Sequence, residues 1–399
     1  MQHHIHAADL GRDGEGMARA VSSCVHCGFC LAACPTYKVM GEEMDSPRGR
    51  IMLMKQVLEG DLAGSDAQPY IDRCLGCLAC ETACPSGVRY RDLLVPFRAR
   101  SEALVRTPAQ RWTREAMLSV LESPARFRAA HLGARIARRI SVVLPARLRE
   151  MIALLPPELP PAEALPERTP AVAPRRARVA LLAGCVQQVL RPAINAAAVR
   201  LLAANGVEVV VPRSQGCCGA LALHTGLAAR GEALAEHNVQ VFPADVDAII
   251  TTTAGCGSAM KERAHRAPVR DVLEFLDALG LRTPLALPRP LVAAYHDACH
   301  LSHGQGIRLA PRRVLAQVRN LTIAELSDGE MCCGSAGLYN LEQPDTAREL
   351  GRRKANAVAE TGAALVVTGN IGCMTQIQAH AAIPVQHTLE LLDLAYSAA

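Results

Sequence analysis

The sequence predicts an α+β protein of several domains: a small α-helical N-terminal domain, followed by a tandem repeat of α/β cysteine-rich units. Two cysteine motifs of identical spacing, with one amphipathic stretch between them, lie within residues 24–84. Beyond residue 176, short apolar runs alternate with helical stretches, which is typical of α/β layers with parallel strands. The cysteine-containing segments of that second region occur twice at a nearly constant interval, and such self-similarity indicates an internal repeat.

The composition of the 399 residues suits a globular protein of two or three domains, since half of the residues are apolar. Five Phe, six Tyr and one Trp offer few stacking platforms, and the net charge is only +5. Domains that bind nucleic acids usually need aromatic platforms or a strongly basic face. We therefore expect no nucleic-acid partner.

The sixteen cysteines indicate metal binding or redox chemistry rather than disulfides. No apolar run reaches the length of a membrane span, and the N-terminal stretch lacks the apolar core of a secretory signal. We therefore expect a cytoplasmic chain, with at most peripheral contact with the inner membrane. Thiols stay reduced in the cytosol, where cysteine clusters more often bind metals.

Residues 1–100 are expected to form the α-helical domain with both cysteine motifs. Between the motifs, Ser46 is suited to cap a helix whose first residue is Pro47, and Gly60 is suited to end it. The apolar stripe of this helix would consist of Ile51, Met54, Val57 and Leu58.

The rest of the chain divides at a proline-rich stretch. Residues 101–154 interleave apolar and arginine positions and are expected to form a helical connector. Residues 155–176 are rich in proline and are expected to form an extended linker. The two cysteine-rich repeats are then expected at residues 177–285 and 286–399.

The first repeat shows the predicted alternation of elements. We expect strands at 177–184, 206–212 and 247–253, and helices at 191–205 and 227–242. Three cysteine pairs then relate the two repeats at intervals of 114, 115 and 117 residues: Cys185 and Cys299, Cys217 and Cys332, Cys256 and Cys373.

Each N-terminal motif has the spacing C-x-x-C-x-x-C-x-x-x-C-P. This is the arrangement of bacterial ferredoxins, in which the first three cysteines hold one cluster and the fourth ligates the other. The spacing therefore predicts a ferredoxin-like domain with two [4Fe–4S] clusters. The predicted ligand sets are Cys24, Cys27, Cys30 and Cys84 for cluster 1, and Cys74, Cys77, Cys80 and Cys34 for cluster 2.

A pair of zinc sites is the alternative for these motifs. Zinc is satisfied by C-x-x-C pairs and gains nothing from a third and fourth cysteine at this spacing. Small residues in the loops (Gly28, Gly76 and Ala79) suit backbone N–H groups that approach cluster sulfurs. His26 lies in the first loop, but four cysteines already suffice, so we do not expect it to be a ligand.

Two neighbouring clusters imply one-electron transfer, so a flavin is needed to link them to two-electron chemistry. The sequence contains no G-x-G-x-x-G and no G-x-x-x-x-G-K-[ST] motif. We therefore expect the flavin on a partner, no catalytic residue in this chain, and no cofactor-binding residues beyond the cluster ligands.

The eight remaining cysteines include two adjacent pairs, in "GCCG" and "CCGS". Adjacent thiols suit different irons of one polynuclear cluster, and the segments lie at predicted strand ends, where α/β sheets place their sites. The alternative is buried structural cysteine. Near Cys299, His296, His300, His303 and Asp297 could be ligands, proton-handling groups or loop hydrogen-bonding groups. The candidate ligands of the repeats are Cys185, Cys217, Cys218, Cys256, Cys299, Cys332, Cys333 and Cys373.

The paired motifs, "PRGRIMLMKQVLEG", "ACPSGVRY" and the two CCG repeats together resemble the family of glycolate oxidase (glycolate dehydrogenase) iron–sulfur subunits. In that family the subunit works with two FAD-domain subunits that oxidise glycolate to glyoxylate, and the electrons leave for a quinone-type acceptor. The resemblance implies a hetero-oligomer in which substrate oxidation occurs on the flavoprotein partner.

The CCG repeats also resemble those of heterodisulfide reductase and of the iron–sulfur subunit of anaerobic glycerol-3-phosphate dehydrogenase. The fullest form of that repeat ends in C-x-x-C, whereas Cys256 is followed by "GSA" and Cys373 by "MTQ". Each repeat could therefore hold a non-cubane cluster, a cubane or no cluster. The two repeats together would hold one or two further clusters at most. The alternative functions are a glycerol-3-phosphate or lactate dehydrogenase subunit, or a disulfide reductase subunit.

Overall fold

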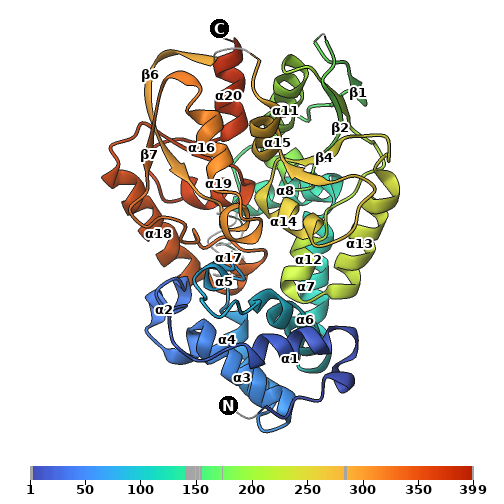
Figure 1. Cartoon of the computed structure of the whole chain (residues 1–399), viewed down its shortest axis with the longest axis vertical. Helices are drawn as coiled ribbons and strands as arrows, with labels where there is room; N and C mark the ends of the chain where they lie inside the picture. The colour runs from blue at the N-terminus through green and yellow to red at the C-terminus, as the bar shows by residue number, and fades with distance from the viewer. Residues whose placement is uncertain are drawn as a thin grey trace.

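The computed structural model describes residues 3–139, 149, 152, 155–172, 174–282 and 285–397. The N-terminal part is a cluster of short helices, which lies at the bottom of Figure 1. In chain order its elements are η1 (Ala7–Asp13), α1 (Gly14–Ser22), α2 (Pro35–Met40), η2 (Glu43–Asp45), α3 (Pro47–Glu59), α4 (Gly64–Asp72), α5 (Ala79–Thr82) and α6 (Tyr90–Leu104).

Helix α3 begins and ends where its sequence predicts. The Ser46 hydroxyl accepts a hydrogen bond from the Gly49 N–H at 2.9 Å, Pro47 is the first helical residue, and Gly60 ends the helix at φ +84°. The apolar stripe packs against α1 and α6 in one core: Ile51 and Met54 are buried, and Val57 and Leu58 are partly buried.

Two further helices, α7 (Pro108–Leu121) and α8 (Pro124–Arg138), continue the chain toward the first repeat (Figure 1). Both helices lie within residues 101–154, where a helical connector is expected. Most of the predicted connector beyond residue 139 lies outside the described residues. Arg114 of α7 joins the parts of the molecule, because it donates to Glu102 of α6 and to Glu342 of the second repeat, each at 2.6 Å.

The first repeat contains a five-stranded sheet of order β1-β3-β2-β4-β5, in which the last four strands are parallel. Strand β1 lies inside the stretch expected to be only a linker. Its residues Arg168 and Thr169 follow the prolines and pair antiparallel with the free edge of β3. The strands are β1 (Arg168–Thr169), β2 (Ala177–Leu182), β3 (Val207–Val210), β4 (Ala248–Thr251) and β5 (Val269–Asp271).

The second repeat contains a four-stranded parallel sheet of order β7-β6-β8-β9. This order matches β3-β2-β4-β5 strand for strand, so the duplication in the sequence is also a duplication in topology. The α/β class and the tandem repeat are thereby confirmed. The strands are β6 (Leu285–His296), β7 (Val318–Glu325), β8 (Leu365–Thr368) and β9 (Val385–His387).

The two repeats stand side by side above the N-terminal helices (Figure 1) and share one apolar core. Helix α11 of the first repeat packs against α20 of the second, and α15 packs against α16. The helices are α10 (Gln187–Leu190), α11 (Ala193–Ala204), α12 (Ala220–Thr225), α13 (Ala228–Val241), α14 (Ala254–Lys261) and α15 (Val272–Leu279) in the first repeat. Those of the second are η4 (His300–Gly304), α16 (Leu309–Leu315), α17 (Tyr339–Glu342), α18 (Pro344–Glu360), α19 (Ile371–Gln378) and α20 (Thr388–Ser397).

Candidate metal centres

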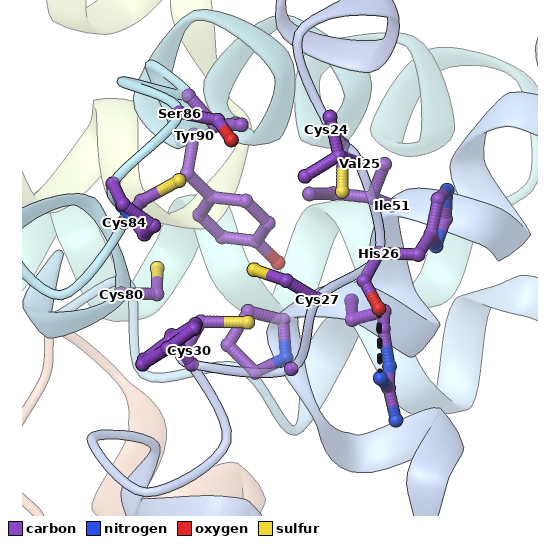
Figure 2. A pocket seen from close by; sticks show the side chains of 16 residues that line it. Cys24, Val25, His26, Cys27, Cys30, Ile51, Cys80, Cys84, Ser86 and Tyr90 are labelled. Atoms are coloured by element: carbon purple, nitrogen blue, oxygen red, sulfur yellow. Dashed lines mark hydrogen bonds between the residues drawn. The ribbon is translucent and has the colours of Figure 1, made fainter.

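A cavity between the two cysteine loops of the N-terminal domain collects thiols from both motifs. Figure 2 shows the side chains of Cys24, Cys27 and Cys30 pointing toward the same space as that of Cys84, with the ring of Tyr90 between them. Cys80 also lines this cavity. The structure thus brings the first three cysteines of one motif together with the last cysteine of the other, as expected for cluster 1.

A second cavity lies deeper in the same domain. It is lined by Cys34, the last cysteine of the first motif, and by Cys74, Cys77 and Cys80 of the second. Each cavity therefore receives at least four thiols, which is the donor set of a [4Fe–4S] cluster. The residues present fit such a group at both places.

The two cavities differ in exposure. Cys27 of the first is exposed, and the neighbouring side chains of Val25 and Phe29 are each 67% exposed. In the second cavity Cys34 and Cys77 are buried. One site therefore lies at the surface of the protein and the other in its interior.

The two cysteine loops share an unusual backbone conformation. His26 and Gly28 of the first loop, like Gly76 and Leu78 of the second, have φ between +55° and +86°. This left-handed conformation is costly for His26 and Leu78. It turns backbone groups toward the cavity: the Gly76 N–H donates a hydrogen bond to the Cys74 sulfur at 3.4 Å. Glycine at positions 28 and 76 is thus explained by the left-handed backbone conformation.

The two arginines at the start of α3 lie beside one cavity each. Arg48 donates to the His26 carbonyl of the first loop at 2.9 Å. Arg50, 1% exposed, donates to Thr36 at 2.9 Å and to Asp45 at 3.0 Å, beside Cys34 of the second cavity. Sequence reasoning missed both residues. A signal was present, because positive charge is unfavourable at a helix N-terminus and its presence there calls for a partner.

Positive charge gathers around Cys74. Burial by itself raises the pKa of this thiol, but the nearby Arg50 and Arg98 guanidinium groups outweigh it and hold the pKa below its usual value. The Tyr90 hydroxyl also donates to the Cys74 sulfur at 3.8 Å. The surrounding positive charge therefore favours the thiolate form of Cys74 in the interior of the protein.

In the first repeat, the four cysteines come together at the carboxyl end of the sheet. Cys185 follows β2, the CC pair precedes α12, and Cys256 lies in the first turn of α14. The Cys185 and Cys217 sulfurs are 3.4 Å apart. Hydrogen bonds from the Cys185 and Cys218 thiols lower the pKa of Cys217 to about 4. The placement at strand ends agrees with the expectation from the sequence.

The second repeat gathers its cysteines in the same way. The Cys299 and Cys332 sulfurs are 3.9 Å apart, and Cys373 accepts a hydrogen bond from the Asn370 side chain at 3.3 Å. Hydrogen bonds from Cys332 and Cys373 hold the pKa of Cys333 far below its usual value. All four of these cysteines are buried.

The second repeat is in direct contact with the interior cavity of the N-terminal domain. Leu75, Cys77 and Ala79 pack in one buried cluster with Cys299 and Cys332. Burial raises the pKa of Cys77, and the nearby Cys299 thiol raises it further. A continuous path of buried sulfur therefore leads from the N-terminal domain into the second repeat.

The polar residues around Cys299 comprise two that bind neighbouring loops, Asp297 and His303, and two buried imidazoles, His300 and His296. Asp297 accepts two hydrogen bonds from Arg312 at 3.0 and 2.7 Å, and a His303 ring nitrogen lies 3.0 Å from the Thr82 hydroxyl. These two residues hold loops together. His300 packs edge-on against His224 of the first repeat, and burial lowers its pKa to about 4. His296 is fully buried.

Comparisons with known proteins agree with this division of the chain. Residues 20–88 match the 4Fe-4S dicluster domain, and residues 179–261 and 293–378 each match the cysteine-rich domain that contains the CCG motif. Within the part of the chain that the structure describes, no helix has both the length and the apolar character needed to cross a membrane.

Two relatives extend over most of the chain. The glycolate oxidase iron-sulfur subunit of Escherichia coli is 37% identical over 94% of this chain and 93% of its own length. The probable glycolate oxidase iron-sulfur subunit of Bacillus subtilis is 35% identical over 89% of this chain and 88% of its own length. Lactate utilization protein A of an Exiguobacterium species is 28% identical over 54% of this chain and 96% of its own length.

Proposed function

Because the chain belongs to the family of glycolate oxidase iron–sulfur subunits, we propose that it transfers electrons within a flavin-dependent complex that oxidises glycolate to glyoxylate. The observation that carries this proposal is the pairing of thiols around two adjacent cavities, one at the surface and one in the interior. Two [4Fe–4S] clusters held there would supply one-electron transfer.

The proposed ligands are the eight N-terminal cysteines in the two sets given above. Side chains and backbone groups around these cysteines favour their role as cluster ligands. Arg50 and Arg98 compensate negative charge at Cys74, and the left-handed loop residues direct backbone N–H groups toward sulfur. Both features stabilise anionic thiolates that are shielded from water.

The difference in exposure suggests a direction for the electrons. A flavoprotein partner would dock at the exposed loop that carries Val25, Cys27 and Phe29, because this surface brings it nearest to cluster 1. From the interior cavity, the contact between Cys77 and Cys299 leads on to the repeats. We propose a quinone-type acceptor beyond them.

Glycolate oxidation would take place on FAD-containing partner subunits. We propose a hetero-oligomer that works in the cytoplasm, with at most peripheral contact with the inner membrane. We propose that the cysteines of the two repeats hold one or two further iron–sulfur clusters, because the four thiols of each repeat lie close together.

The test is a Cys30→Ser variant of the full chain, purified anaerobically with its partners. The variant should lose the reduced EPR signal of one [4Fe–4S] cluster and stop electron flow from flavin to quinone. Ser86→Ala is the matched control, because Ser86 lines the same cavity without a thiol. Undiminished quinone reduction by Cys30→Ser, or stoichiometric zinc in place of iron in the wild-type chain, would refute the proposal.

Lactate is a second candidate substrate for the complex, favoured by the similarity to lactate utilization protein A over about half of the chain. The electron-transfer role would be unchanged, because the flavoprotein partner chooses the substrate. Rates of quinone reduction by the purified complex with glycolate and with lactate decide between the two. A faster rate with lactate would overturn the glycolate assignment and leave the electron-transfer role intact.

A further inference from the structure

The two repeats differ at one buried position beside their cysteines. His296 is the last residue of β6, the central strand of the second sheet, and Leu182 is the last residue of β2, the corresponding strand of the first. The two positions are 114 residues apart, which is also the interval between Cys185 and Cys299. Each precedes its cysteine by three residues. Equivalent positions of the two repeats therefore hold a histidine in one site and a leucine in the other.

Leu182 needs no explanation beyond packing, since it is 2% exposed in an apolar cluster with Cys185 and Ile249. His296 is 0% exposed, and neither of its ring nitrogens makes a regular hydrogen bond among the described residues, although its ring is close enough to the Cys333 sulfur to help lower the pKa of that thiol. Buried polar groups in folded proteins are nearly always hydrogen-bonded, because desolvation without a partner costs free energy. A buried imidazole that makes no regular hydrogen bond and lies beside cysteine sulfurs is suited to bind a metal together with them.

Two cysteine sulfurs lie close to this imidazole. A ring nitrogen of His296 and the sulfurs of Cys333 and Cys373 all lie within 4.8 Å of one another. The three residues come from β6, from the CC pair and from α19, and all are buried. Imidazole nitrogen and thiolate sulfur are the ligands that iron–sulfur clusters accept from proteins.

We propose that His296 is a ligand, together with Cys333 and Cys373, of an iron–sulfur cluster in the second repeat, and that the first repeat holds its cluster without a histidine. This inference rests on the proposed function only in taking an iron–sulfur cluster as the occupant of the repeats. It adds a ligand that the cysteine pattern does not contain and makes the two sites chemically different.

A consequence for electron transfer follows from the charge of the ligand. A neutral imidazole adds no negative charge, and histidine ligation raises the reduction potential of iron–sulfur clusters relative to all-cysteine ligation. The second repeat is also the one whose cysteines contact Cys77. The site next to the interior cavity would therefore be the stronger electron acceptor of the two repeats.

The test uses the full chain, purified anaerobically from cells grown with 15N-histidine. Pulsed EPR of the wild-type protein should show one strongly coupled 15N nucleus. His296→Leu, which reproduces the residue of the first repeat, should lose this coupling, whereas His303→Gln should keep it because His303 is occupied by Thr82. The EPR signals of the N-terminal clusters report in each variant that the chain is folded.

Two results would overturn the inference. One is a wild-type protein whose second-repeat cluster shows no strong 15N coupling, and the other is a coupling that persists in His296→Leu. If His296→Leu does not fold, His296→Cys supplies a ligand of another type and should retain iron while losing the coupling. An iron count that is unchanged in Cys333→Ser also overturns the inference, but it leaves standing the function that Cys30→Ser tests.

Discussion

The two cysteine-rich repeats have the same strand order and the same cysteine pattern, yet their surroundings differ. The second repeat places Cys299 and Cys332 against the N-terminal domain and has His296 beside its other two cysteines. The first repeat packs Cys185, Cys217 and Cys218 among apolar side chains, with Leu182 in the equivalent place. Duplication preserved the sheet and the thiols, while the contacts with the rest of the chain made the two sites unequal.

Removing one thiol from each repeat should have the largest effect and should affect the two repeats differently. Cys333→Ser should reduce electron transfer from the flavoprotein to quinone to the background rate, because the second repeat adjoins the interior cavity. The matched variant Cys217→Ser should leave the reduction of the second repeat by glycolate intact. Stopped-flow absorbance measures both steps. If both variants lose reduction of the second repeat equally, electrons do not reach the second repeat before the first.

A second comparison concerns stability at the same two positions. Leu182→Ala should destabilise the protein by about 2–5 kcal/mol, because it removes a buried side chain and leaves a cavity. His296→Leu should stabilise the metal-free chain by about 1–3 kcal/mol, because it removes an unpartnered buried polar group. Thermal unfolding of the metal-free variants measures both effects. A metal-free His296→Leu variant that is less stable than the metal-free wild type would mean that the imidazole has a partner in the protein.

A third difference between the repeats lies at the start of α15 and α20, the last helix of each repeat. Asp271 accepts a hydrogen bond from the Leu273 N–H at 2.9 Å, and His387 accepts one from the Leu389 N–H at 3.2 Å. The equivalent helix caps are thus an acid and a base. Burial raises the pKa of Asp271 to about 7 and lowers that of His387 to about 4.

These shifts give the two caps opposite pH dependences. The raised pKa of Asp271 contributes stability that is lost as the pH rises from about 4 to 7, since the folded state binds the additional proton. The lowered pKa of His387 contributes stability that is lost as the pH falls from about 6.5 to 4. Asp271→Asn and His387→Gln should each change the slope of stability against pH by up to about 1.4 kcal/mol per pH unit, in opposite directions. Urea unfolding at several pH values measures the slopes, and slopes that change in the same direction would contradict the assignment.

Much of this architecture could be predicted because its determinants are local. The limits of α3 follow from Ser46, Pro47 and Gly60, and the main strands of the first repeat follow from short apolar runs bounded by turns. The cysteine spacing alone led to the pairing of three thiols of one motif with the last thiol of the other, and the structure brings those residues to one cavity. Strand β1 escaped prediction, because two residues carry no period and pair only with an edge that another segment supplies.

The motifs, the duplication and the candidate thiols are all visible in the sequence, since spacing and periodicity are properties of neighbouring residues. Tertiary structure alone decided which cavity is exposed, which repeat contacts Cys77, and that Arg50 compensates charge beside Cys34. It also separated His296, which lies beside the sulfurs of Cys333 and Cys373, from His303, which lies against Thr82. The reason is physical: burial, charge compensation and hydrogen bonding depend on partners that folding brings from distant parts of the chain.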